Sequence, residues 1–324
     1  MADSSDDPGR VPDFFIVGHP KCGTTALYEM LRRHPQVFMP AFKEPWFFAS
    51  DMRPRFQPPR FGVAPRTLEE YTRLFAAVPP GRLAGEASSS YLRSSEAAAA
   101  IARMRPDARI VAIFREPASF LRSLHHQLLL DHVESEKDLA AALALEPARR
   151  EGRSIPTRSH MPQMLLYSEH VRYAEQLRRY REHFPDEQVL ALIYDDFRAD
   201  NEGTLRTVLG FLGVEAQAPL ELLDANPSSR RMRSQRLDEM LHAVSVGTGP
   251  VARGVKAAVK AGTSRGLRER ALRATRRNLV YGRPQPPDET LMAGLRERFH
   301  GEVEALGEYL GRDLVSLWRY DRHG

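Results

Sequence analysis

The sequence predicts a three-layer α/β fold in which helices flank a mostly parallel central sheet. Three short apolar runs, at 14–18, 109–114 and 189–194, have the composition of strands that are buried on both faces. Stretches with helical spacing of apolar residues separate these runs, and strands that alternate with helices form parallel sheets. Ligands of such sheets bind at the carboxyl ends of the strands.

The first half of the chain opens as strand, loop and helix. The run at 14–18 ends in a glycine, and Leu27, Met30 and Leu31 then recur with helical spacing. A connection at 35–65 is rich in Pro and aromatic residues, has no period, and is typical of a functional loop. The other elements expected here are helices at 24–34, 67–75, 94–104 and 117–130 and strands at 82–86 and 109–114.

The second half repeats the alternation. A long amphipathic helix is expected at 161–184, followed by the strand at 189–194 and a helix at 202–212 that ends before Gly213. Residues 225–290 are less regular, basic and punctuated by Gly and Pro, which indicates an insertion or lid. A helix at 290–310 closes the chain. We expect one domain over 1–324, with a disordered leader at 1–12.

Composition limits the classes of protein. The 324 residues are 42% hydrophobic and 27% charged, which suits a globular core. The single cysteine excludes an intrachain disulfide and a cysteine-built metal site. No apolar run approaches the length of a membrane span, and the acidic, polar start is unlike a signal peptide. A cytoplasmic protein is therefore expected.

Positive charge is concentrated in one region. The formal net charge is +5, yet residues 230–283 hold 14 Lys and Arg against three acids. This region is either a solvated arginine-rich face or a surface that meets an anion such as a nucleotide, a sulfated or phosphorylated acceptor, or a membrane. Peripheral membrane contact stays open, whereas no motif for reading nucleic acid is present.

The loop after the first strand has the features of a phosphate site. Residues 18–27 read Gly-His-Pro-Lys-Cys-Gly-Thr-Thr-Ala-Leu. A glycine turn that leads into a helix exposes backbone N–H groups at the positive end of the helix dipole. Lys21 adds a positive charge, and Thr24 and Thr25 add hydroxyls. The lysine precedes the glycine, so the loop is not a Walker A loop; a plain strand–helix turn is the alternative.

This loop resembles the 5′-phosphosulfate-binding loop of sulfotransferases that use 3′-phosphoadenosine 5′-phosphosulfate (PAPS). The resemblance implies a P-loop-like fold and a donor site that includes Lys21. Lys21 would also stabilise the charge that develops on the leaving phosphate. The other donor-binding residues that it implies are Cys22, Gly23, Thr24, Thr25 and Ala26.

A second motif points to the same donor. Sulfotransferases hold the 3′-phosphate of PAPS with an Arg at the end of a later strand and a Ser eight residues on, and this spacing is that of Arg115 and Ser123. A structural ion pair with Glu116 or another acid is the alternative for Arg115. Arg230 and Arg233 lie where the family often contributes further contacts to the 3′-phosphate, with solvated charge as the alternative.

The aromatic loop supplies a candidate base. Residues 43–48 read Lys-Glu-Pro-Trp-Phe-Phe. The glycan N- and O-sulfotransferase branch of the family carries a Glu in the matching place, where it takes the proton of the acceptor, so the resemblance implies this role for Glu44. His19 and the pair His125 and His126 are rival bases. Trp46 and Phe47 are candidate acceptor contacts, as are His19 and His125.

Residues 85–91 read Gly-Glu-Ala-Ser-Ser-Ser-Tyr and resemble a segment that lines the active site in the family. Glu86 and Ser88 are therefore further candidate acceptor contacts, although a structural role for Glu86 is equally open. Ser89 stands where proline is usual. Ala87 stands where enzymes that modify glycosaminoglycans carry a catalytic lysine, which argues against a heparan-like acceptor.

The resemblance implies transfer of a sulfonate group from PAPS to a hydroxyl or amine, with no metal. The expected acceptor is a small secondary metabolite, such as a glycosylated or nucleoside natural product. A lipid or carbohydrate acceptor is the alternative. Two other classes remain, a P-loop-like nucleotide kinase and a non-enzymatic basic protein that binds a surface. The sequence does not indicate the oligomeric state.

Overall fold

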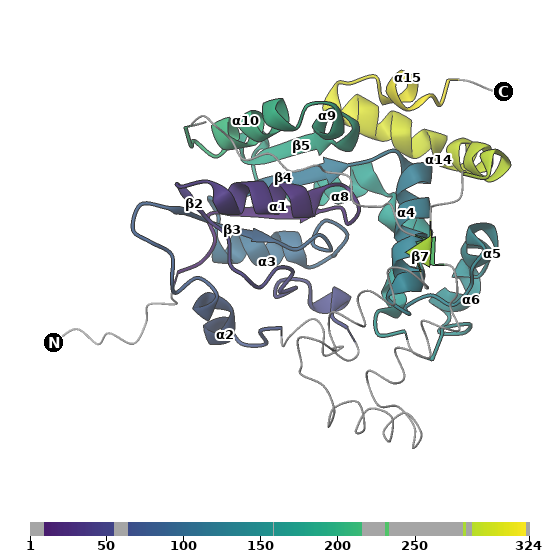
Figure 1. Ribbon diagram of the computed structural model, residues 1–324, viewed down its shortest axis with the longest axis horizontal. Helices are drawn as coiled ribbons and strands as arrows, with labels where there is room; N and C mark the ends of the chain where they lie inside the picture. The colour runs from purple at the N-terminus through teal and green to yellow at the C-terminus, as the bar shows by residue number, and fades with distance from the viewer. Residues whose placement is uncertain are drawn as a thin grey trace, which may run out of the picture. The chain divides into compact units, whose positions relative to one another are not determined.

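Five strands form one parallel sheet in the order β2-β3-β1-β4-β5 (Figure 1). The computed structural model describes residues 10–54, 64–157, 159–215, 231–232, 281–282 and 287–321. Every neighbouring pair in this sheet runs parallel, which confirms the predicted fold class. The strands are β1 (Phe14–Gly18), β2 (Val37–Phe38), β3 (Leu83–Ala87), β4 (Arg109–Phe114) and β5 (Val189–Ile193).

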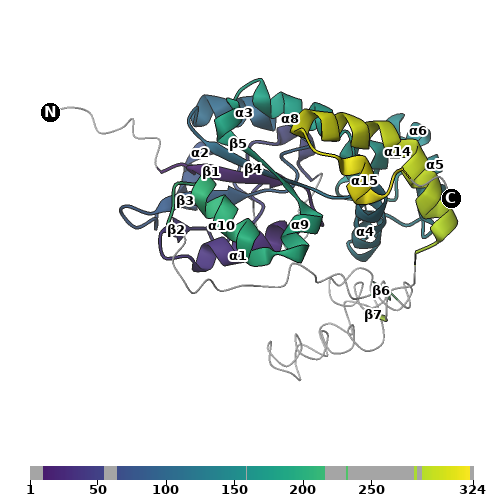
Figure 2. The ribbon, with the colours of Figure 1, turned by 90° about the horizontal axis from the view of Figure 1, so that it is seen from above.

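Helices cover both faces of the sheet, and this explains why β1 is apolar throughout and buried at every residue. Figure 2 shows α1 and α10 over one face and α3 and α8 over the other. The helices are α1 (Thr24–Arg33), α2 (Leu68–Arg73), α3 (Ala97–Met104), α4 (Pro117–Leu130), α5 (Leu139–Ala144), α6 (Glu146–Arg150), α7 (Tyr167–His170), α8 (Tyr173–Arg181), α9 (Tyr194–Ala199), α10 (Asn201–Phe211), α14 (Glu289–Leu310) and α15 (Leu314–Trp318), with 3-10 turns η1 (Ser50–Met52), η3 (Pro162–Leu165) and η4 (Asp186–Gln188).

The order of the strands defines where a ligand can bind. Phe14 of β1 pairs with Gly85 of β3 on one side and with Arg109 of β4 on the other. After β1 the chain builds the β2–β3 side of the sheet, and it then crosses to build the β4–β5 side. Open parallel sheets bind ligands outside the carboxyl ends of the strands, where the direction of winding reverses. The loops that follow β1 and β4 lie at this point.

The helix predicted over 161–184 is wrong as a single element, because the chain forms η3, α7 and α8 there. Arg172 has φ −75° and ψ 58°, which lie outside the helical region. The side-chain amide of Gln176 donates to the carbonyl oxygen of Glu169 at 2.8 Å and so satisfies a group that the interruption leaves without a helical partner. An amphipathic period alone does not reveal such an interruption.

Several other boundaries differ from the prediction. The strand predicted at 189–194 stops at Ile193, because Tyr194 is already the first residue of α9. The short elements β2, α5, α6 and α15 were not predicted. Residues 10–12, expected in a disordered leader, run directly into β1. There Arg10 donates to Asp13, and Pro12 is buried.

The chain divides into two units, one formed by Met1–Asn226 with Glu289–Gly324 and the other by Pro227–Asp288. In the second unit, β6 (Arg231–Met232) and β7 (Tyr281–Gly282) form an antiparallel pair with Arg231 opposite Gly282. The predicted contacts Arg230 and Arg233 lie outside the described residues, as do residues 1–9. The single domain with a basic lid stays a prediction.

Candidate active site

The loop between β1 and α1 has the backbone that an anion site requires. Gly23 is the N-cap residue of α1 and has φ 84°, a conformation that glycine adopts without strain. A Cβ atom here would lie 2.8 Å from the ring of Phe197, so the close approach also requires glycine. Because glycine has no side chain to cap the helix, the first N–H groups of α1, at Thr24 and Thr25, stay available to a ligand.

Lys21 extends from this loop towards α4. Its ammonium group donates to the side-chain oxygen of Gln127 at 3.2 Å, and the amide nitrogen of Gln127 donates to Asp131 at 2.9 Å. Burial lowers the pKa of Lys21, as does the nearby Arg115, whereas Asp131 raises it. The ammonium is therefore a partly desolvated cation, which interacts more strongly with an anion than a solvated one would.

Arg115, the first residue after β4, connects the two strand ends. Its guanidinium donates to the carbonyl oxygen of Lys21 at 2.9 Å and lies 4.8 Å from the centre of the Tyr194 ring. Among the described residues, Arg115 and Glu116 form no ion pair with each other. The Glu116 carboxylate instead caps α4 through the N–H groups of Ala118 and Ser119.

Ser123 lies on α4, eight residues after Arg115. Its hydroxyl oxygen is buried and has no hydrogen-bond partner among the described residues. Residues four apart lie on one face of a helix, so Ser123 shares a face with Gln127, which contacts Lys21. The structure thus brings one lysine, one arginine and one helix N-terminus to the carboxyl ends of β1 and β4, and α4, the helix that follows β4, carries the unpartnered hydroxyl.

Two residues of the loop turn into the core instead of towards the site. Cys22 is fully buried, and burial raises the pKa of its thiol to about 12. His19 is also fully buried, with its ring against Phe114, Phe120 and Tyr173. Burial lowers the pKa of His19 to about 3, so its ring is neutral at physiological pH. Both side chains pack in the core beneath the loop and hold its backbone in place.

The hydrogen bond between His19 and Gln176 fixes the protonated ring nitrogen. Nε2 of His19 lies 2.6 Å from the side-chain oxygen of Gln176. The amide nitrogen of Gln176 is already a donor to the carbonyl of Glu169, so its oxygen faces His19 as an acceptor. Nε2 of His19 therefore carries the proton.

Glu44 lies at the carboxyl end of β3, next to β1 in the sheet. Its backbone N–H donates to the carbonyl of Ala87 at 3.0 Å. Its carboxylate accepts from the ammonium of Lys43 at 2.7 Å and from the hydroxyl of Ser89 at 3.1 Å. The side chain is 31% exposed, so an incoming molecule can reach it. Ser89, which departs from the proline usual in the family, makes one of the two contacts that orient this carboxylate.

The aromatic residues after Glu44 pack against the segment that follows β3. The N–H of Trp46 donates to the hydroxyl of Ser88 at 3.3 Å. The ring of Phe47 stacks on Tyr71, with 4.4 Å between centroids and 11° between planes. Ser88 is fully buried, and its hydroxyl contacts the backbone of the aromatic loop; its contact with the acceptor stays a prediction.

Glu86 is fully buried beneath this loop. Its carboxylate accepts hydrogen bonds from the hydroxyls of Tyr71 and Tyr91, each at 2.9 Å. Burial is the main cause that raises the pKa of Glu86 to about 7. The structure therefore places Glu86 behind the loop of the candidate base rather than on an open surface.

His125 also lies in the interior. Its ring nitrogens lie 2.8 Å from the hydroxyl of Tyr167 and 3.1 Å from the carbonyl oxygen of Lys137. Burial lowers its pKa. Because both nitrogens have partners within the protein, His125 is part of a core network in this structure and does not face an open site.

Comparison with known proteins agrees with this arrangement. A family model described as a sulfotransferase domain matches residues 11–248. The chain belongs to the sulfotransferase family. Mouse heparan sulfate glucosamine 3-O-sulfotransferase 3A1 is 30% identical over 206 residues, which cover 64% of this chain and 47% of that protein. Human carbohydrate sulfotransferase 15 is 46% identical over 68 residues, 20% of this chain and 12% of that protein.

A solved structure extends the similarity over nearly the whole sulfotransferase chain. The crystal structure of a sulfotransferase from Alicyclobacillus acidocaldarius is 26% identical, with a TM-score of 0.66. The match covers 96% of this chain and 99% of that one. By contrast, the chain spans less than half the length of the curated relatives named above. The resemblance to PAPS-dependent sulfotransferases and the predicted fold are thus confirmed.

The residues of this sulfotransferase fit the PAPS that its family uses. The unpartnered Ser123 hydroxyl and the Arg115 guanidinium suit one phosphate group, and Lys21 with the N-terminus of α1 suits a second. Among the residues described, no group of three or more His, Cys, Asp or Glu side chains is arranged to hold a metal ion. Within the same ranges, no helix has both the length and the apolar character to cross a bilayer.

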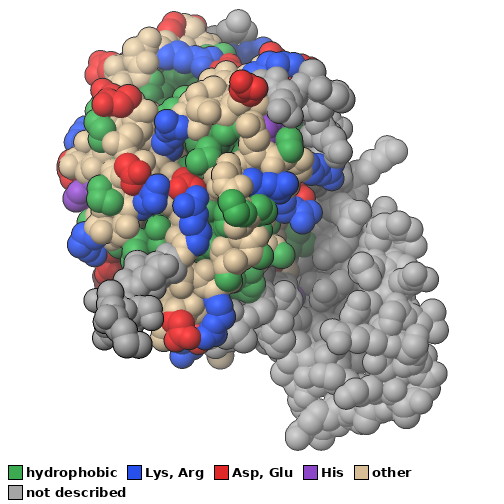
Figure 3. Space-filling view, turned by 90° about the vertical axis from the view of Figure 1, so that its left-hand side faces the viewer, with side chains coloured by type: hydrophobic (Ala, Val, Ile, Leu, Met, Phe, Trp, Pro, Cys, Tyr) green, Lys and Arg blue, Asp and Glu red, His purple; other side chains and the backbone are tan. Residues whose placement is uncertain are grey.

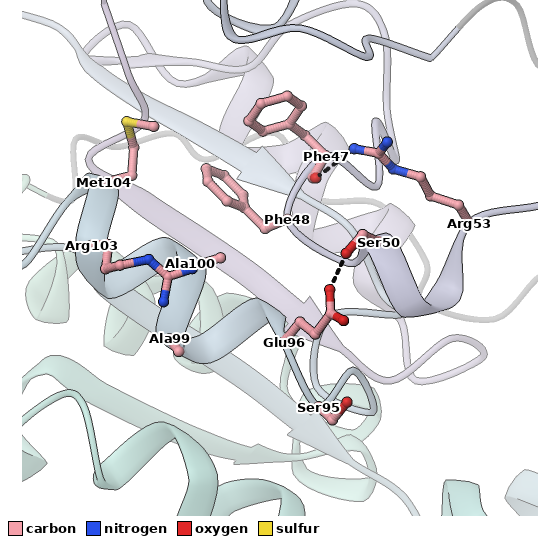
Figure 4. A pocket seen from close by; sticks show the side chains of 10 residues that line it. All are labelled: Phe47, Phe48, Ser50, Arg53, Ser95, Glu96, Ala99, Ala100, Arg103 and Met104. Carbon is pink, nitrogen blue, oxygen red and sulfur yellow. Dashed lines mark hydrogen bonds between the residues drawn. The ribbon is translucent and has the colours of Figure 1, made fainter.

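A cavity of about 620 Å³ lies between the segment after Glu44 and α3 (Figure 4). Its apolar lining comes from two phenylalanines and small or flexible side chains of α3. Two arginines and a glutamate, which accepts from the hydroxyl of Ser50, lie among its polar lining. The lining residues are Phe47, Phe48, Ser50, Arg53, Ser95, Glu96, Ala99, Ala100, Arg103 and Met104.

Sequence reasoning missed Gln127, Asp131 and Tyr194. Gln127 on α4 and Asp131, the C-cap residue of that helix, follow Ser123 at intervals of four, so the helical period could have identified them. Tyr194 follows directly after β5, the strand beside β4, at the edge where ligands bind. Gln127 contacts Lys21 directly, and Asp131 is linked to Lys21 through Gln127. Tyr194 contacts Arg115.

Proposed function

We propose that the protein transfers the sulfonate group of PAPS to a hydroxyl or amine of an acceptor, with Glu44 as the general base. The observation that carries this proposal is the contact between Arg115 and Lys21, because it joins the two motifs of the donor site into one cationic site. Family membership supports the class of reaction.

The donor site derives its proposed role from charge and position. Arg115 and Ser123 would hold the 3′-phosphate, since a guanidinium binds phosphate through two parallel hydrogen bonds. Thr24, Thr25 and the N-terminus of α1 would hold the 5′-phosphate. Lys21 would donate to the phosphate oxygen on which negative charge develops. When bound, PAPS supplies the sulfonate group that is transferred.

Glu44 is the proposed base because its position in the family motif and its partial exposure allow an acceptor to reach it. Its carboxylate is partly exposed and oriented by Lys43 and Ser89. His19 and His125 are both buried. Nε2 of His19 contacts Gln176, and both ring nitrogens of His125 contact groups of the protein. A base must come within hydrogen-bond distance of the proton that it removes. This geometry favours Glu44 over His19 and His125, whereas His126, half-buried on α4, remains a rival base.

We propose a small acceptor with an apolar part, such as a glycosylated or nucleoside natural product. Two observations support this choice. The cavity beside Phe47 has a volume typical of small-molecule sites, and half of its lining residues are apolar. Ala87, which is buried, supplies no cation where glycosaminoglycan-modifying enzymes carry a lysine. The names of the curated relatives favour the alternative, a carbohydrate acceptor; a lipid is the other alternative.

A non-enzymatic role in binding an anionic surface has less support from the described residues. On the face shown in Figure 3, Lys and Arg side chains are interspersed with Asp and Glu rather than gathered in one patch. The basic stretch 230–283 lies almost entirely outside the described residues. A cytoplasmic location also stays a prediction.

Titration calorimetry with 3′-phosphoadenosine 5′-phosphate (PAP), AMP and ATP tests the donor site. We expect binding of PAP that requires the 3′-phosphate and that falls by about tenfold to a hundredfold in Arg115→Ala, the loss expected for a charge-assisted hydrogen bond. Arg206→Ala is the control, because Arg206 is on α10 and pairs with Glu202. Equal affinity for PAP and AMP would contradict the proposal and favour a kinase-like nucleotide site.

A further inference from the structure

Glu86 lies at the centre of a buried network that its position on β3 alone does not explain. Its carboxylate accepts from Tyr71, which comes from α2, and from Tyr91, which follows β3. Both hydroxyls donate to the same carboxylate oxygen, Oε2, whose lone pairs can receive them at once. Burying it without a cationic partner is costly, which suggests that the network has a purpose beyond packing.

Both tyrosines hold the aromatic segment that follows Glu44. The ring of Tyr71 stacks on Phe47, and the hydroxyl oxygen of Tyr91 accepts from the N–H of Phe48 at 3.3 Å. A tyrosine hydroxyl has one proton. Because Tyr91 donates that proton to Glu86, its lone pairs are left to accept from Phe48. The carboxylate therefore sets the orientation of the hydroxyl that holds the segment.

The same segment requires support from outside. Glu44 has φ 60° and Trp46 has φ 52°, values that cost non-glycine residues about 1 kcal/mol or more each. The neighbours of Glu86 along the chain supply part of this support, since the carbonyl of Ala87 and the hydroxyl of Ser88 accept from the backbone N–H groups of Glu44 and Trp46. The segment 44–48 is thus held by contacts with residues 86–91.

We propose that Glu86 is a positioning residue: through Tyr71 and Tyr91 its carboxylate fixes the segment 44–48 and thereby the direction of the Glu44 side chain. The inference rests on the proposed function of Glu44. Glu86 itself is fully buried. Its effect on the reaction passes through the two tyrosines to the loop of the base.

The electrostatic surroundings of Glu86 make the inference testable. The titratable groups whose charges act on it, or on which it acts, are Tyr71, Tyr91, Tyr180 and Glu44. Burial raises the pKa of Glu86 to about 7, so its charge changes across the neutral range. Above that pH the ionised carboxylate is a strong acceptor for both tyrosines. Below it, the protonated carboxyl is a weaker acceptor and holds the segment less firmly.

Trp46 provides a direct readout, because it is one of the two tryptophans of the chain and lies within the segment. The other, Trp318, donates to Asp195 and is replaced in a Trp318→Phe parent. We expect the fluorescence of Trp46 in this parent to change with a midpoint near pH 7, and Glu86→Gln to abolish the change. Tyr91→Phe removes a donor that favours the ionised form, so it should raise the midpoint by about one pH unit.

Glu146→Gln is the matched control, because Glu146 is also a buried carboxylate but accepts from the backbone and hydroxyl of Ser168, each at 2.6 Å. It should leave the transition unchanged. A fluorescence that is flat from pH 5.5 to 8.5 in the parent, or a transition that persists in Glu86→Gln, would overturn the proposal. If Glu86→Gln does not fold, the direction of the midpoint shift in Tyr91→Phe decides. Neither donor nor acceptor is needed, so failure here is distinguishable from failure to bind PAP.

Discussion

The guanidinium of Arg115 donates a hydrogen bond to the main-chain carbonyl of Lys21, with 2.9 Å between Nη1 and the oxygen. The contact joins the residue after β4 to the loop after β1. In the proposed donor site, the group that binds the 3′-phosphate therefore also holds the loop that binds the 5′-phosphate. A change at Arg115 is expected to affect both ends of the nucleotide.

Arg115→Lys tests this double role. An ammonium cannot make two parallel bonds to a phosphate and also hold the carbonyl of Lys21. We expect the affinity for PAP to fall by about tenfold or more. The affinity for AMP, which has no 3′-phosphate, should fall as well. Calorimetry measures both, with Arg109→Lys at the opposite end of β4 as the control. An unchanged affinity for AMP would mean that the contact does not organise the loop.

Gln127→Glu tests the contact between α4 and Lys21. The substitution replaces a neutral acceptor 3.2 Å from the ammonium with a carboxylate. That carboxylate would pair with Lys21 and repel the phosphates of the nucleotide. We expect the affinity for PAP to fall by about tenfold.

The control for Gln127→Glu is Gln188→Glu. Gln188 is in η4, at the amino end of β5, where its side chain donates to the carbonyls of Pro106 and Ala108. The Gln188→Glu variant adds the same negative charge as Gln127→Glu, but at the edge of the sheet opposite to Lys21. Equal effects of the two variants would show that net charge, rather than the position of Gln127, determines the loss.

Arg149→Ala is expected to destabilise the fold strongly. Arg149 makes two bonds of 2.8 Å to Glu134, and the two side chains are 1% and 0% exposed. Removing one partner leaves a buried, uncompensated charge, which costs about 3–5 kcal/mol. Urea unfolding measures the loss. Arg153→Ala breaks the exposed pair with Glu151 and should change stability little, so a similar loss in both would contradict the argument.

Local sequence patterns were sufficient to predict several strands and the loop of the donor site. The apolar runs identified β1, β4 and β5 because strands covered on both faces carry no polar alternation. The loop of Lys21 was identified from its glycine, lysine and hydroxyl residues. The interruption at Arg172 was not, since the buried polar contacts of Gln176 that accompany it leave no trace in the local apolar period.

Long-range packing determines the rest of the candidate site. Glu86 was predicted as an acceptor contact or a structural residue, and the sequence contained no sign that Tyr71, fifteen residues earlier, donates to it. His19 and His125 carry a chemistry that suits a base, yet both are buried. Burial of an individual side chain depends on which elements meet, and that information lies in the tertiary structure.

Titration of Glu86 should make the free energy of unfolding depend on pH. Burial raises its pKa from 4.5 to about 7 on folding. Below pH 4.5 the carboxyl is protonated in both the folded and the unfolded state, so its burial adds no penalty for a charge. Between 4.5 and 7 the unfolded state loses its proton first, and folding becomes less favourable as pH rises. Glu86→Gln should therefore gain up to about 3 kcal/mol relative to the wild type across this range.

Unfolding in urea at pH 4.5, 6 and 7.5 measures this difference. The comparison between the two proteins cancels groups that titrate alike in both. Glu146→Gln serves again as the control, since its carboxylate accepts a backbone N–H and a hydroxyl from Ser168 rather than two tyrosine hydroxyls. A difference between Glu86→Gln and the wild type that does not vary with pH would show that Glu86 keeps one charge state throughout.

Glu44→Gln is expected to separate catalysis from donor binding. The amide preserves the size of the side chain and can still accept from Ser89, but it cannot take a proton. General-base catalysis contributes about 100-fold to 10,000-fold, so kcat should fall by at least about 100-fold while the affinity for PAP stays unchanged. The measurement is release of PAP from PAPS, with an acceptor chosen from a panel of phenols, glycosides and nucleosides. Glu29→Gln, at an exposed pair with Arg32 on α1, is the control and should retain full activity. If Glu44→Gln retained the wild-type kcat, the proton would have to leave by another group. Because His19 and His125 are enclosed in the core, that result would point to His126, the half-buried rival base on α4.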